Sequence, residues 1–149
     1  MIKVDKALWG EGLFATENIE KNVIVVQLSP SREWIYVSNG KKMKSIVKSL
    51  EQHITRKKNL PRDSIIQFGS YVFWEPLFNE NIPLWYKLNH SRKHAQLKVE
   101  LIIKQEEKPM LVWKTIRAIK KGEELYFDYG EPDPEWKKND GFLPLIKNY

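Results

Sequence analysis

Apolar and polar residues alternate along several short stretches of the chain, which is the pattern of half-buried β-strands. In residues 125–129, the alternation places Leu125, Phe127 and Tyr129 on one face of the predicted strand, and Tyr126 and Asp128 on the other. Further strands are predicted at residues 2–4, 23–26, 34–37 and 65–74, the last with a bulge at Gly69, and residues 97–103 and 110–116 predict a hairpin. The pattern therefore predicts a mainly β fold.

One stretch follows the helical period instead. From residue 42 onward, apolar side chains recur at intervals of three and four, at Met43, Ile46, Val47, Leu50 and Ile54. This spacing predicts one amphipathic helix that ends before the Asn-Leu-Pro sequence at residues 59–61. We expect it to form a helical insertion at about residues 38–64.

The bulk composition agrees with one intracellular domain. A chain of 149 residues with 42% hydrophobic residues can build one core, so we expect a single domain over residues 1–149, with residues 131–149 as a C-terminal tail. No apolar run approaches the roughly 18 residues of a membrane span, and the first residues lack the apolar segment of a signal peptide. We expect a soluble intracellular protein with no membrane contact; cytoplasm and nucleus are not distinguished.

The sequence contains no cysteine, which excludes disulfides and thiolate zinc sites. His90 and His94 are four residues apart, but no carboxylate stands between them as in an HExxH zinc motif. We expect no metal.

Charge is unevenly distributed. Between Lys41 and Arg62, eight basic residues stand against the single acidic residue Glu51, a local charge of +7. This segment is read as a solvated helix face or, less favoured, as a contact for nucleic acid or an acidic partner. Residues 123–140 carry seven acidic residues against two lysines, where a basic peptide would be attracted.

Residues 10–15, GEGLFA, also match the dinucleotide fingerprint G-x-G-x-x-A. That fingerprint requires a helix to begin at the glycines. Here the β-branched run at residues 23–26 follows soon afterwards, and such residues favour a strand. We therefore expect a glycine turn between two strands, whose bare backbone can lie against a flat ligand.

Two later segments concentrate polar chemistry. Asn89, His90 and Ser91 follow an apolar and aromatic lead-in, so we expect this polar cluster to lie against a hydrophobic strand formed by residues 84–88. Residues 122–130, GEELYFDYG, present Tyr129 at a strand end beside Gly130, where another backbone or a ligand can come close.

The three segments GEG (10–12), NHS (89–91) and ELYFDY (124–129), in this order and spacing, resemble the SET-domain family of protein lysine methyltransferases. The resemblance spans nearly the whole chain. It implies a fold of small curved sheets with a C-terminal pseudoknot, in which the NHS strand is threaded through a loop near ELxFDY. The chain resembles the small stand-alone SET proteins of viruses or bacteria.

By this resemblance, the protein transfers methyl groups from S-adenosylmethionine to a lysine of a histone or another protein, yielding S-adenosylhomocysteine without a metal. The alternative is a catalytically inactive SET-like interaction module that docks on nucleic acid or an acidic partner through its basic helix. The intact NHS sequence and Tyr129 favour the enzyme.

The resemblance also assigns roles to individual residues. Tyr129 and Tyr71 are the expected catalytic residues, and Trp136 either closes the lysine channel or anchors the tail. The cofactor-binding set comprises Gly10, Glu11, Gly12, Tyr71, Asn89, His90 and Tyr129. The substrate lysine channel comprises Tyr71, Phe127, Tyr129 and Trp136.

The chain departs from the family pattern around the NHS sequence. The family often reads RFINHSCDPN where this chain reads YKLNHSRKHA, so Tyr86 stands in place of an arginine. At position 127 the family carries phenylalanine or tyrosine. Phenylalanine removes a hydroxyl that would tether the amine, which is compatible with the addition of more than one methyl group.

Overall fold

Short strands dominate the computed structural model, which describes residues 1–8, 10–37, 43–130 and 145–146. The mainly β fold with one helical insertion is confirmed. The chain divides into two units, one built from Met1–Leu28 and Pro83–Asp128 and the other from Ser29–Ile82 and Tyr129–Tyr149. The extent of a single domain over residues 1–149 stays a prediction. No helix among the described residues is long and apolar enough to cross a membrane.

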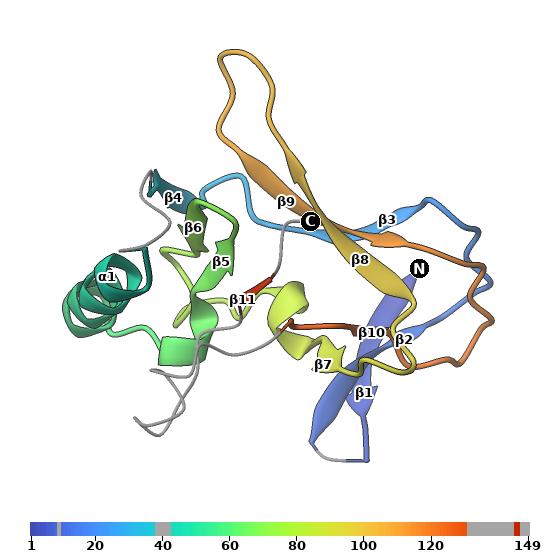
Figure 1. Ribbon diagram of the computed structural model, residues 1–149. Coiled ribbons are helices and arrows are strands. Elements are labelled where there is room, and N and C mark those ends of the chain that lie inside the picture. Colours follow the sequence, from blue (N-terminus) through green and yellow to red (C-terminus); the bar gives the residue numbers. More distant parts are fainter. Residues whose placement is uncertain (9, 38–42, 131–144, 147–149) are drawn as a thin grey trace. The chain divides into compact units, whose positions relative to one another are not determined.

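The first unit contains two sheets (Figure 1). An antiparallel hairpin pairs β1 with β2, and a five-stranded sheet has the order β3-β9-β8-β10-β7. The strands are β1 (Ile2–Lys6), β2 (Glu11–Ala15), β3 (Ile24–Gln27), β7 (Asn89–His90), β8 (Leu97–Ile102), β9 (Met110–Thr115) and β10 (Tyr126–Phe127). The predicted β8–β9 hairpin is confirmed, with Leu97 opposite Thr115 and Ile102 opposite Met110.

Two indole rings occupy the centre of the first unit. Trp113 on β9 is fully buried and stacks on Trp85, with ring centroids 6.0 Å apart and an interplanar angle of 4°. The Phe127 ring meets Trp113 edge-on at 5.8 Å. Aromatic pairs of this kind stabilise a core beyond the area that they bury. The contact with Trp113 therefore holds the Phe127 side of β10 against the core of the first unit.

The segment before the NHS sequence is not the predicted strand. Leu84–Lys87 form a 3₁₀ helix that follows Pro83, whose φ of −69° suits the turn. Trp85 and Leu88, three residues apart, are the buried side chains of this segment. The burial therefore follows a period of three, which the continuous apolar run in the sequence concealed.

Among the described residues, the second unit contains one four-stranded sheet, of order β11-β5-β6-β4, and one α-helix (Figure 1). The strands are β4 (Glu33–Tyr36), β5 (Ile66–Phe68), β6 (Tyr71–Trp74) and β11 (Leu145–Ile146). The prediction of one bulged strand over residues 65–74 is wrong. Phe68 pairs with Tyr71, and Gly69, with a φ of +58°, takes part in a tight turn between two antiparallel strands.

Helix α1 (Met43–Lys58) confirms the predicted insertion helix. Its last residue, Lys58, is followed by Asn59, whose φ of +54° is a common conformation just after a helix. Its buried face includes Val47, Ile54 and the acidic residue Glu51, whereas Ile46 is 42% exposed. The buried face thus includes a charged side chain that was not part of the predicted apolar set, and Ile46 of that set is not buried.

Arg62 compensates the buried carboxylate. The Arg62 Nε donates to Glu51 Oε1 at 2.6 Å, and the Arg62 Nη2 donates to Glu51 Oε2 at 3.3 Å. The Glu51 side chain is 1% exposed and that of Arg62 is 34% exposed. The two-point pairing ties α1 to the 3₁₀ turn Arg62–Ser64 that follows it.

Replacing Arg62 with methionine should lower the free energy of unfolding by about 3 kcal/mol, because it leaves the Glu51 carboxylate buried without its guanidinium partner; this is the lower end for a buried pair, since Arg62 itself is partly exposed. The double variant Glu51→Met/Arg62→Met should recover most of this loss, since it removes the buried charge as well. Urea unfolding of both variants would measure the difference. A single variant as stable as the wild type would show that the pair contributes nothing.

Candidate functional site

The glycine turn closes the β1–β2 hairpin. The Ala7 backbone N–H donates to the Gly10 carbonyl at 2.8 Å, and Gly10 has a φ of +84°, in the left-handed region that favours glycine. The predicted turn between two strands is therefore confirmed.

Gly12, on β2, lies where side chains from two distant segments converge. A β-carbon at this position would lie 3.0 Å from Asn89 Nδ2 and in still closer contact with Glu124 Oε1. The space that glycine leaves is therefore taken up by the Asn89 amide and the Glu124 carboxylate. All three motif segments meet at this point.

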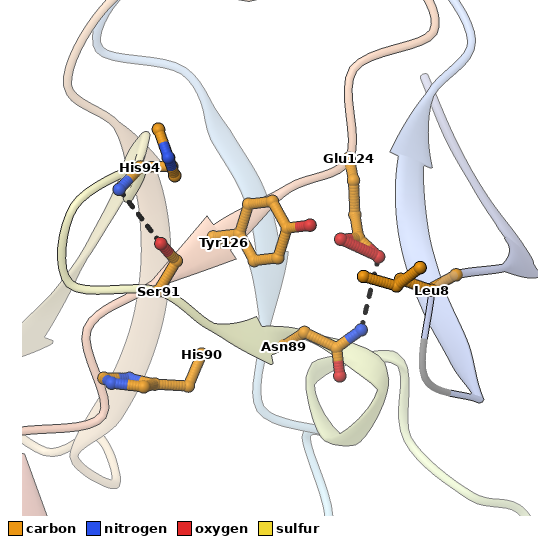
Figure 2. A pocket seen from close by; sticks show the side chains of 8 residues that line it. Leu8, Asn89, His90, Ser91, His94, Glu124 and Tyr126 are labelled. Carbon is orange, nitrogen blue, oxygen red and sulfur yellow. Dashed lines mark hydrogen bonds between the residues drawn. The ribbon is translucent and has the colours of Figure 1, made fainter.

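Asn89 is held by both other segments. Its Nδ2 donates to the Glu11 carbonyl oxygen at 3.0 Å and to Glu124 Oε1 at 3.3 Å. A carbonyl and a carboxylate can only accept, so the nitrogen of the amide must face them. Figure 2 shows this nitrogen directed at Glu124 and the amide oxygen turned the other way.

Parallel pairing brings the NHS strand beside β10. Asn89 lies opposite Tyr126 and His90 opposite Phe127, and the Ser91 backbone N–H donates to the Phe127 carbonyl at 3.3 Å. Residues more than thirty positions apart thus become neighbours through backbone hydrogen bonds.

Gln96 secures β10 from its other side. Its Nε2 donates to the Glu124 carbonyl at 2.7 Å, and its Oε1 accepts from the Tyr126 N–H at 2.8 Å. The side chain is buried, with 3% of the residue exposed. Its amide therefore pairs with the backbone of residues 124–126 as a neighbouring strand would.

A cavity of about 350 Å³ lies at this junction (Figure 2). Ala7 and Leu8 of the hairpin form an apolar part of its lining, and Leu8 is 86% exposed. The remaining lining residues are Asn89, His90, Ser91, His94, Glu124 and Tyr126. Its volume lies at the lower end of the range of about 300–1,000 Å³ typical of small-molecule sites.

Glu124 also engages Tyr126. A hydrogen bond between the Tyr126 side chain and the Glu124 carboxylate is the largest cause of the raised pKa of Tyr126, followed by desolvation of the phenol. The phenol therefore stays neutral beyond its ordinary range, and Figure 2 shows its oxygen turned toward Glu124.

The residues after Asn89 contribute further polar groups to the cavity and its surroundings. The His94 backbone N–H donates to Ser91 Oγ at 3.0 Å, which closes the turn that follows β7. His90 Nδ1 lies 3.8 Å from Asp128 Oδ1, and Arg92 Nε lies 3.5 Å from Oδ2 of the same carboxylate. These side chains are 40–61% exposed, so both contacts contribute little to stability.

The structure brings together Glu11, Gly12 and Asn89 of the predicted cofactor set, and Asn89 and His90 line the cavity. Phe127, predicted for the lysine channel, is 5% exposed and contacts Trp113. The functional roles of these residues stay predictions.

Two of the described residues that were predicted for the site belong to the second unit. Tyr71 on β6 lies among aromatic rings, 5.1 Å from the Tyr36 ring and 5.9 Å from the Trp34 ring between centroids. Tyr129 directly follows Asp128, the last residue of the first unit. Their part in catalysis stays a prediction, and Trp136 lies outside the described residues.

Glu124, Tyr126 and Gln96 were not predicted as site residues. Glu124 stands inside the ELYFDY motif, so its position in that motif was an available signal. Tyr126 was placed on the face opposite Phe127 but given no role. Gln96 carries no sequence signal, because its importance depends on the buried backbone that it contacts.

Comparison with known proteins identifies the family. A model of the SET domain matches residues 10–130, which is most of the chain. A search of curated proteins found no match.

Solved structures share the fold. CpSET8 from Cryptosporidium is 24% identical with a TM-score of 0.59, over 90% of this chain and 58% of that one. A humanized mutant of the Chaetomium thermophilum Polycomb Repressive Complex 2 bound to the inhibitor GSK126 is 20% identical with a TM-score of 0.58, over 90% and 15%. The ctPRC2 complex with H3K27me3 and H3K27M is 18% identical with a TM-score of 0.63, over 99% and 16%.

This chain thus spans only part of each of these proteins. At these identities the likeness establishes a common fold and nothing more about activity. Because the family model covers residues 10–130, the chain belongs to the SET-domain family.

Proposed function

We propose that the protein is an S-adenosylmethionine-dependent protein-lysine N-methyltransferase. The observation that carries the proposal is the junction of the three motif segments, where Asn89 bonds to the Glu11 carbonyl and to Glu124 beside the side-chain-free Gly12. Family membership supports the same activity.

The residues at the junction suit the cofactor. The amide oxygen of Asn89 accepts no hydrogen bond from the described residues, which leaves it available to a donor such as the ammonium group of S-adenosylmethionine. Ala7 and Leu8 offer apolar surface to its less polar parts. The chemistry that the cofactor supplies when bound is a methyl group on a positively charged sulfur.

The chain's own contribution is to position and deprotonate the substrate amine. Free lysine has a pKa of about 10.4, so it is almost fully charged at neutral pH. By the family resemblance, we assign Tyr71, Tyr129 and Trp136 to the lysine channel, where aromatic surroundings disfavour the ammonium form by desolvation. Within it, we assign the Tyr129 hydroxyl to orienting the neutral amine, because such positioning accounts for much of the rate.

We propose a lysine in a basic protein segment as the substrate. The acidic excess of residues 123–140 would attract such a segment, whereas the basic residues between Lys41 and Arg62 would repel it. One solved structure of similar fold contains H3K27me3 and H3K27M, so histone tails are the first substrates to test.

The proposal is tested by calorimetric titration with S-adenosylmethionine, followed by incubation with labelled cofactor and histones or a cell lysate. We expect saturable binding that Asn89→Ala weakens about tenfold, as for the loss of a hydrogen bond of about 1.4 kcal/mol, and label on a lysine located by mass spectrometry. Absence of both binding and label would reject the enzyme and favour the interaction module.

A further inference from the structure

Glu124 occupies the centre of the junction without a role in the proposed chemistry. We propose that Glu124 is a positioning residue, which fixes the Asn89 amide with its nitrogen toward the β1–β2 hairpin and its oxygen toward the ligand. This inference rests on the proposed function for its effect on binding, but its structural content concerns this chain alone.

The Asn89 amide offers both donors and an acceptor. An asparagine amide has two N–H groups and one oxygen, and it can bind with either end forward. Here Nδ2 donates to both the Glu11 carbonyl and Glu124 Oε1. The Glu11 carbonyl offers a second reason to keep the nitrogen inward, but Glu124 supplies the charged acceptor, which is the stronger one.

The Glu124 carboxylate lies in the space beside Gly12. The contact of its carboxylate with the position of a Gly12 β-carbon means that even a methyl group on residue 12 would displace it. Gly12 lies outside the left-handed region of φ, so an alanine there would meet this contact without added backbone strain. The absence of a side chain at Gly12 therefore provides the space that the Glu124 carboxylate occupies.

The Glu124 backbone is itself held by neighbouring residues. Its carbonyl accepts from Gln96 Nε2, and the residue forms an antiparallel bridge with Phe14 on β2. On the carboxylate side, the hydrogen bond with the Tyr126 side chain restricts it further. Glu124 is therefore held at its backbone and at its carboxylate. It can impose one orientation on the Asn89 amide, which a mobile surface glutamate could not.

The experiment is a double-mutant cycle on Gly12 and Glu124, read as the Kd for S-adenosylmethionine. Glu124→Ala and Gly12→Ala should each raise Kd about tenfold, equivalent to about 1.4 kcal/mol. The double variant should be weakened by clearly less than the hundredfold of two independent effects, because removing the Glu124 side chain relieves the closer of the two contacts of the methyl group and leaves only that with Asn89 Nδ2 at 3.0 Å. Glu124→Gln keeps an acceptor and should stay within about threefold of the wild type.

Two results would overturn the inference. One is a folded Glu124→Ala protein that binds as tightly as the wild type. The other is a double variant weakened about a hundredfold, since additive effects would mean that Gly12 and Glu124 act separately. Thermal unfolding of each variant identifies any loss of binding that comes from misfolding.

A readout without ligand separates this inference from the proposed function. In ¹⁵N–¹H spectra of the unliganded protein, the Asn89 side-chain NH₂ should give a resolved pair of signals that exchanges slowly with solvent in the wild type and in Glu124→Gln. In Glu124→Ala the pair should exchange faster. Equal exchange in all three proteins would overturn the inference even if the cofactor binds, and the expected pattern would support it even if the cofactor does not.

Discussion

Tyr129→Phe is expected to lower the rate of methyl transfer by at least about a hundredfold while the affinity for S-adenosylmethionine changes little. The loss is of the size that follows removal of one positioned hydrogen-bonding group from an active site. Phenylalanine keeps the aromatic ring, so the proposed channel keeps its apolar wall and loses only the hydroxyl. Single-turnover methylation of a lysine peptide would measure the rate, and calorimetry the affinity.

The division between rate and affinity is what identifies the role of Tyr129. A variant that binds cofactor normally and transfers slowly has lost an interaction made in the transition state. A variant that loses affinity in proportion would instead place the hydroxyl in cofactor binding. Turnover near that of the wild type would remove Tyr129 from the mechanism.

Gln96→Leu is expected to lower the free energy of unfolding by about 4 kcal/mol. The change leaves the Glu124 carbonyl and the Tyr126 N–H without their side-chain partners in a buried place, and each unsatisfied group costs about 1–3 kcal/mol. Leucine is similar in size, so the loss is of hydrogen bonds more than of packing. Urea unfolding would measure it.

Two variants serve as controls for the Gln96 prediction. Gln105→Leu makes the same change in the exposed β8–β9 loop and should stay within about 0.5 kcal/mol of the wild type. Gln96→Glu offers both a donor and an acceptor only while its carboxyl is protonated. Its deficit relative to the wild type should therefore shrink as the pH falls. Equal losses for Gln96→Leu and Gln105→Leu would contradict the proposed role of Gln96.

The sequence predicted those parts of the fold that depend on local pattern. The hairpin at Gly10, the long helix and the β8–β9 pair each follow from a repeat or a turn signal that is local in the sequence. The 3₁₀ helix before Asn89 and the turn at Gly69 were mistaken for strand, because a continuous apolar run does not reveal its period.

The candidate site was predictable in its motifs and not in its connections. The resemblance indicated that the glycine turn, Asn89 and the ELYFDY segment belong together, and the first two are joined at 3.0 Å. It did not indicate that Glu124 is the link, or that Gln96 supports the link from behind. Those roles arise from burial and from the matching of donors to acceptors, which appear only when distant segments are packed.

The parallel insertion of β10 has a consequence for how the protein is made. Tyr126 and Phe127 take their places between β7 and β8, both of which leave the ribosome earlier. Because such long-range pairing is slow and must await its last strand, a nascent chain that stops short of Glu124 lacks one of the three segments of the junction. Ligand binding should therefore appear late in synthesis and abruptly, with no weaker precursor on the elongating chain.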